Sequence, residues 1–175
     1  MKTRERLLLI ALVLAPACGL ASCGAEESRA ALPDSDVPES FFLASAPSGA
    51  KSVGEVVASS QDGDSVVVTG RVGGAHKVFV DGYAAFSIVD ASVQPCGADN
   101  MDDCPTPWDY CCETPEELAA KSLSVELAAE GKVLAARPRG FHGLDHLKTV
   151  VVAGRVDKDD AGNVRVLATG LHVVQ

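Results

Sequence analysis

Valine-rich strand patterns dominate the chain from residue 51 onward. Short runs of β-branched and other apolar residues alternate with clusters of Gly, Asp and Asn, which is typical of strands joined by turns. The runs of this type are Ser65 to Val72, Lys77 to Val80, Ala84 to Val89, Ser122 to Ala128, Thr149 to Val156 and Val164 to Val174. Residues 157–163 (DKDDAGN) predict a hairpin turn between the last two runs. We therefore expect an all-β domain of five or six strands.

Two short segments depart from the strand pattern and predict helices. Val53 to Ser59 precedes the first long strand and is long enough for one or two helical turns. Thr114 is a good N-cap, Pro115 suits the first helical position, and two acidic residues follow in the first turn. We expect a short helix that ends near Lys121.

Two of the expected strands have almost the same sequence, VVVTGRV at residues 66–72 and VVVAGRV at residues 150–156. In each, a Gly late in the strand predicts a sharp bend or a bulge, the means by which small barrels turn corners. An early and a penultimate strand of this kind resemble the oligonucleotide/oligosaccharide-binding (OB) domains of bacterial envelope proteins, over residues 53–174. The resemblance implies a small OB-fold-like barrel. A small β-sandwich is the alternative fold.

The first 22 residues have the pattern of a lipoprotein signal peptide. Three basic residues lie within residues 1–6, and the apolar run that follows, residues 7–14, is too short to span a bilayer. Residues 20–23 (LASC) resemble a lipobox, which implies cleavage before Cys23 and its acylation, for example with palmitate. Several acyl chains anchor a protein stably. By the same resemblance, Gly24 implies an outer-membrane location, facing the periplasm. The alternative is an ordinary secretory signal cut near Ala21 or Ala25.

Residues 23–50 are rich in Pro, Ser, Ala and acidic residues, and this composition predicts a flexible tether. Within it, Phe41, Phe42 and Leu43 form an apolar triplet, which we expect to dock as an edge element on the domain at residues 51–175.

The charge of the chain is strongly acidic. Removal of residues 1–22 takes away three basic residues and one acidic residue, so 15 basic and 24 acidic residues become 12 and 23, and the net charge changes from −9 to about −11. Such a charge disfavours nucleic acids, because their binding depends on Lys and Arg neutralising phosphates. Only a local basic patch would support an OB domain for single-stranded nucleic acid, and its candidates are Arg137, Arg139, His142 and Lys148.

Residues 94–115 (QPCGADNMDDCPTPWDYCCETP) interrupt the strand pattern with Cys96, Cys104, Cys111 and Cys112. In an oxidising envelope compartment, an even number of cysteines predicts disulfides. A bond between Cys111 and Cys112 is disfavoured, because adjacent α-carbons are about 3.8 Å apart, less than disulfides usually need. Cys96 then pairs with Cys111 or with Cys112, and Cys104 with the other.

Metal binding by the same four cysteines is the alternative, since thiolates bind copper and zinc. Their spacing departs from the pairs of closed zinc sites. Trp108, Asp109 and Tyr110 are candidate ligand- or partner-binding residues, and packing of Trp108 over the barrel mouth is the other interpretation. The segment CPTPWDYCC, with the lipoprotein start, looks like bacterial envelope proteins with OB-like domains, a resemblance that implies no particular activity.

No sequence motif for catalysis is present. The chain has no G-x-S-x-G elbow, P-loop or dinucleotide fingerprint, and Gly143 replaces the glutamate that H-E-x-x-H would need after His142. We therefore expect a non-catalytic binding or interaction module, with a protein or small-molecule partner and no cofactor. The alternative is a metal- or haem-handling protein. A resemblance to small OB-fold haem chaperones, which use a histidine near the end of the barrel, implies His172.

Overall fold

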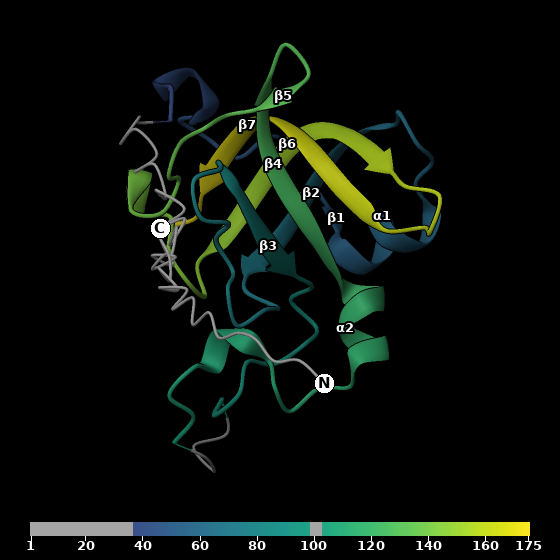
Figure 1. Cartoon of the computed structure of the whole chain (residues 1–175), viewed down its shortest axis with the longest axis vertical. Coiled ribbons are helices and arrows are strands. Elements are labelled where there is room, and N and C mark those ends of the chain that lie inside the picture. The colour runs from purple at the N-terminus through teal and green to yellow at the C-terminus, as the bar shows by residue number, and fades with distance from the viewer. Residues whose placement is uncertain (1–36, 99–102) are drawn as a thin grey trace, which may run out of the picture. The chain divides into compact units, whose positions relative to one another are not determined.

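The computed structural model describes residues 37–98 and 103–175 (Figure 1). The predicted signal peptide, Cys23 and residues 24–36 of the predicted tether lie outside the described residues. Within the described ranges, no helix has the length and apolar character needed to cross a membrane.

Five strands form a closed β-barrel, and their bounds are β2 (Ser65–Val72), β3 (Ala85–Val89), β4 (Ser122–Ala129), β6 (Thr149–Lys158) and β7 (Val164–Val173). Their hydrogen-bonded order is β2-β3-β4-β7-β6, and β6 pairs with β2 to close the barrel. All of these pairs are antiparallel except β4 with β7, which is parallel. This arrangement confirms the predicted small OB-fold-like barrel rather than the sandwich.

Two outer strands of two residues each were not predicted. They are β1 (Lys51–Ser52), parallel to β2, and β5 (Lys132–Val133), antiparallel to β4. The expected strand at residues 77–80 is reduced to a single bridge between Phe79 and Phe86. Strands this short carry no alternating pattern from which they can be recognised.

The two predicted helices are present, and both lie near one end of the barrel (Figure 1). In α1 (Val53–Ser59), Ser52 and Glu55 form a capping box, with Ser52 Oγ accepting from Glu55 N and Glu55 Oε2 accepting from Ser52 N. Val53 and Val56 are fully buried in the core. In α2 (Pro115–Lys121), Thr114 Oγ1 accepts from Glu117 N, as the sequence predicts.

The late glycines of the twin strands meet different needs. Opposite β6 the pairing shifts from Ala153 with Gly170 to Gly154 with Ala168, so the extra residue is Thr169 and the bulge lies in β7 rather than in the glycine-bearing strand. Gly154 lets the backbone of this bulged partner approach closely, because a Cβ on Gly154 would lie 3.0 Å from Ala168 Cα. In β2 the glycine makes room for α1, because a Cβ on Gly70 would lie 2.8 Å from Val53 Cγ2.

The barrel domain begins before the predicted boundary at residue 51. Val37 and Phe41 are buried in the core, and Phe41 ends the 3-10 helix η1 (Glu39–Phe41). Phe42 bridges to Leu171 in parallel, and Leu43 N donates to Leu171 O at 2.8 Å. The apolar triplet therefore docks as an edge element, as predicted, and residues 37–43 belong to the domain because burial of their apolar side chains holds them there.

A buried carboxylate joins α1 to the end of β3. Asp90 is 6% exposed and accepts hydrogen bonds from Gly54 N, in the first turn of α1, at 2.8 Å and from Ser92 N at 2.9 Å. Burial acts to raise the pKa of Asp90, but these hydrogen bonds outweigh it and hold the pKa below its ordinary value.

We expect Asp90→Asn to lower the free energy of unfolding by about 2 kcal/mol at pH 7, because the amides of Gly54 and Ser92 lose a charged acceptor. A depressed folded-state pKa stabilises the fold fully above the unfolded-state pKa of about 3.9, and this stabilisation is lost as the pH falls through the folded-state value. Urea unfolding at pH 7 and at about pH 3 measures both effects. The control is Asp81→Asn, since the Asp81 side chain is 78% exposed. A gap between Asp90→Asn and the unsubstituted protein that stays constant with pH would contradict the charge argument.

Candidate functional site

A groove of about 410 Å³ lies between the loop after β2 and the loop before β6. The first loop is stiffened by hairpin hydrogen bonds from Val80 N to Ala85 O and from Ser87 N to Val78 O. We call this feature the cationic groove, and its lining residues are His76, Lys77, Val78, Phe79, Val80, Asp81, Gly82, Arg137, Pro138, Arg139 and His146.

Planar side chains are layered at the cationic groove. The ring of Phe79 lies 5.4 Å from that of His146, and Arg139 Cζ lies 5.8 Å from the Phe79 centroid, within cation–π range. Trp108 stacks on His146 with centroids 4.1 Å apart and an interplanar angle of 12°. Trp108 therefore packs against His146, a residue of the groove lining, but does not itself line the groove.

The ionisable residues of the lining are mostly basic, although the chain has a net charge of −9. Five of them are Lys, Arg or His, and Asp81 is the acidic one. Arg139 Nε donates to Asp145 Oδ1 at 2.8 Å, outside the lining. Burial and the nearby charge of Arg139 lower the pKa of His146, so its imidazole is neutral at neutral pH. The permanent charges of Lys77, Arg137 and Arg139 make the groove a local exception on an acidic protein.

The basic patch that the sequence suggests is only partly formed. Arg137 and Arg139 both line the cationic groove, whereas Lys148 does not. The His142 ring stacks on Phe42 at 4.3 Å, and its Nε2 lies 2.7 Å from Glu39 Oε2. His142 thus holds the N-terminal segment against the barrel.

Three of the four cysteines of residues 94–115 lie close together in the structure. Ligand atoms of Cys96, Cys104, Asp109 and Cys111 all lie within 4.8 Å of one another, and we call these four residues the thiol cluster. Cys96 Sγ and Cys111 Sγ are 3.6 Å apart. No disulfide joins the cysteines among the described residues. The predicted disulfides are thus not formed here, because the separation of Cys96 Sγ and Cys111 Sγ is well beyond the bond length of about 2.0 Å.

The thiols of Cys96 and Cys111 are electrostatically unequal. Burial acts to raise the pKa of Cys96, but hydrogen bonds with Cys112, Cys111 and Cys104 lower it overall. The hydrogen bond with Cys96 and the nearby Asp109 carboxylate raise the pKa of Cys111. Of these two thiols, Cys96 therefore loses its proton more readily than Cys111.

The three candidate binding residues Trp108, Asp109 and Tyr110 lie in different surroundings. Tyr110 is fully buried, packs with Val89 and Val93, and its hydroxyl accepts from Arg71 Nη1 at 3.4 Å. It therefore anchors the segment and offers no surface to a ligand. Trp108 is partly buried against the core, which agrees with the packing interpretation. Its buried Nε1 has no hydrogen-bond partner in the described part of the chain.

Asp109, the third of these residues, is held by its neighbours in the chain. Its Oδ2 accepts from Thr106 Oγ1 at 2.8 Å, and its Oδ1 accepts from Cys111 N at 3.0 Å. Its Oδ2 also lies 3.9 Å from Nδ1 of His76, a residue of the groove lining. Asp109 is thus the member of the thiol cluster that lies next to the cationic groove.

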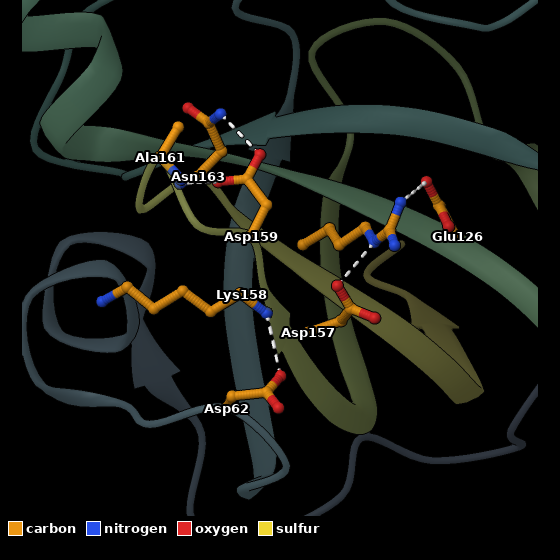
Figure 2. Close-up of polar contacts among 8 residues, drawn as sticks. Asp62, Glu126, Asp157, Lys158, Asp159, Ala161 and Asn163 are labelled. Atoms are coloured by element: carbon orange, nitrogen blue, oxygen red, sulfur yellow. Dashed lines mark hydrogen bonds and ion pairs between the residues drawn. The ribbon is translucent and has the colours of Figure 1, made fainter.

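In an acidic hollow on β4, β6 and β7, the carboxylates are bonded to residues of the hollow and of the adjoining turn (Figure 2). Arg165 Nε donates to Asp157 Oδ1 at 3.0 Å and its Nη1 lies 3.6 Å from Glu126. The Asp159 carboxylate accepts from Ala161 N and from both the backbone and the side chain of Asn163. The contacts of Asp159 lie within the predicted hairpin turn.

The histidine that the haem resemblance implies has a structural contact. His172 Nδ1 lies 2.9 Å from Leu43 O, on the edge where the N-terminal segment docks. The sequence did not single out Phe79, Lys77 or His146 as functional. No local signal marks them, because they lie in loops about 60 residues apart that only the closed barrel brings together.

No protein-family model and no curated protein sequence matches this chain.

Proposed function

We propose that this protein is a non-catalytic binding module of the bacterial cell envelope, which takes up a small ligand with an anionic group and a flat apolar body in the cationic groove. One observation carries the proposal. Lys77, Arg137 and Arg139 all line the cationic groove on a chain whose net charge is −9. A concentration of positive charge against the overall sign of the protein favours an anionic ligand at this place.

The cellular location in this proposal rests on the sequence. The basic start, the short apolar run and the LASC segment support lipid anchoring through Cys23 at the outer membrane, facing the periplasm. The barrel would then stand off the membrane on residues 24–36, which lie outside the described residues.

The planar side chains support the flat apolar part of the ligand. Phe79 offers an aromatic face, and Asp145 orients the Arg139 guanidinium near that face. A guanidinium binds carboxylates and phosphates through paired hydrogen bonds, so Arg139 suits the anionic group. The volume of about 410 Å³ is within the range of small-molecule sites.

The size and charge of the site favour a small ligand over a nucleic acid. Single-stranded nucleic acid needs a groove that follows several phosphates, with a series of stacking platforms. Here the basic residues line one groove of about 410 Å³, and the acids Glu126, Asp157 and Asp159 line a separate hollow.

Titration with 1-naphthoate, which has one carboxylate and a flat apolar body, tests the proposal. The reporter is the fluorescence of Trp108, the single tryptophan, which stacks on His146 of the groove. We expect saturable binding, and Arg139→Gln should weaken it about 10-fold or more, since a charge-assisted hydrogen bond contributes about 1.5–3 kcal/mol. Lys132→Gln makes the same change of charge on β5, away from the groove lining, and should stay within about 2-fold.

The chemistry of the probe supplies the second control. The neutral analogue 1-naphthalenemethanol should bind about 10-fold more weakly, because it lacks the carboxylate. Equal affinity of both compounds, or an unchanged affinity in Arg139→Gln, would overturn the proposal. Tighter binding of an oligo(dT) strand than of naphthoate would favour the nucleic-acid alternative instead.

A further inference from the structure

We propose that the thiol cluster, Cys96, Cys104, Cys111 and Asp109, binds a zinc ion. The inference concerns different atoms from the proposed ligand site and does not depend on it. Three thiol sulfurs and a carboxylate oxygen, all within 4.8 Å of one another, form a four-membered donor set. Four donors of N, O or S type are the usual complement of a structural zinc site.

The spacing of the sulfurs suits a tetrahedral metal. Ligand sulfurs about 2.3 Å from zinc are about 3.8 Å from one another in a tetrahedron. Cys96 Sγ and Cys111 Sγ are 3.6 Å apart. The side chains therefore need little movement to accept the ion.

The convergence of the donors distinguishes a metal from a disulfide. One disulfide uses two sulfurs and requires only that this pair meet. Here Cys104 and the Asp109 carboxylate converge on the same point as Cys96 and Cys111. A carboxylate plays no part in a disulfide but is an ordinary zinc ligand.

The donor set also selects among soft metals. Cuprous copper prefers sites made of thiolate and thioether sulfur alone, whereas zinc accepts sulfur and oxygen together. Asp109 is held by Thr106 Oγ1 and Cys111 N, and such contacts to a ligand carboxylate orient it toward the metal. Three thiolates with one carboxylate thus point to zinc.

The exposure of the cluster allows the ion to enter. Cys96 is buried, Cys104 is half-buried and Cys111 is exposed, so the donors span the distance from the core to the surface. On binding, each of the three thiols releases its proton to solvent and the zinc takes the sulfur lone pairs, with no change of oxidation state.

Metal analysis of the full chain, purified under non-reducing conditions, tests the inference. We expect one zinc per chain, and replacement with Co²⁺ should give thiolate-to-cobalt charge transfer together with the visible bands of a tetrahedral ion. Cys104→Ser should lower the zinc affinity about 100-fold or more, and Asp109→Asn, which keeps the size of the side chain, about 10-fold or more.

Cys112→Ser is the matched control, because it changes an adjacent cysteine that is not one of the four donors. It should keep zinc binding within about 3-fold of the unsubstituted chain. Circular dichroism confirms that each variant is folded. Zinc loss in Cys112→Ser as large as in Cys104→Ser would overturn the proposed donor set.

Intact mass measurement gives the decisive alternative. A mass lower by two hydrogens for each of two disulfides, followed by no stoichiometric zinc uptake after reduction, would replace the zinc site with a disulfide staple. Neither result depends on naphthoate binding, so failure of the zinc site and failure of the ligand site can be told apart.

Discussion

Gly154→Ala is expected to lower the free energy of unfolding by about 3 kcal/mol or more. A Cβ at this position, opposite the bulge in β7, would collide with the carbonyl oxygen of Leu167 and lie 2.8 Å from Val166 Cγ1 and 3.0 Å from Ala168 Cα. Two of these three atoms are backbone of β7. These backbone atoms cannot move away without breaking the β6–β7 pairing of the barrel, so the clash cannot be relieved by a small local shift.

Urea unfolding followed by Trp108 fluorescence measures this effect. Gly170→Ala is the matched control, because Gly170 also lies in the β6–β7 pair but its Cβ would meet only the Leu43 side chain, at 2.9–3.2 Å. A side chain can turn aside, so we expect a loss below about 1.5 kcal/mol. Equal losses in the two variants would show that the backbone contact is not what makes Gly154 necessary.

Tyr110→Ala is expected to cost about 4 kcal/mol, the second large effect. The ring is fully buried against Val89, Val93 and Leu118, so truncation opens a cavity that the neighbouring strands cannot close. A Cβ on Gly73 would lie 2.7 Å from the Tyr110 ring, which shows how closely this ring packs on the end of β2. We therefore expect loss of the ring to detach residues 103–115 from the end of β2 as well as to lower the free energy of unfolding.

Tyr110→Phe separates packing from hydrogen bonding. It keeps the ring and removes only the hydroxyl that accepts from Arg71, so a loss of about 1 kcal/mol is expected. Urea unfolding measures both variants, and hydrogen exchange at Gly74 N, which donates to Trp108 O, reports whether the segment stays docked. A Tyr110→Ala protein within 1 kcal/mol of the unsubstituted protein would show that the segment is held by other contacts.

The elements that the sequence predicted well are those with strong local signals. The alternation of valines in β2 places every second side chain in the core, and the Thr114-Pro115 start defines α2 without help from the rest of the chain. The N-terminal boundary of the barrel domain was harder to predict from the sequence. Val37 lies in a segment whose composition is that of a tether, yet it is buried in the core, and η1, which follows it, contacts β7 at the far end of the sequence.

For the candidate sites too, the sequence indicated residue types but not the contacts between distant residues. Sequence alone brought forward the cysteines, Trp108 and the pair Arg137 and Arg139, because residue type and spacing suggest their chemistry. It could not place Asp109 with three thiols, or His146 between Phe79 and Trp108, because those contacts depend on loop conformation.

By itself, the sequence determined the five strands of the barrel, both helices and the hairpin turn, since each follows from residues close together in the chain. The tertiary structure alone decided how the barrel closes, what covers its N-terminal edge and which charges share a groove. Residues 76–82 and 137–146 meet only because β3 and β4 pair between them, and a contact over that separation is set by strand register rather than by any local preference.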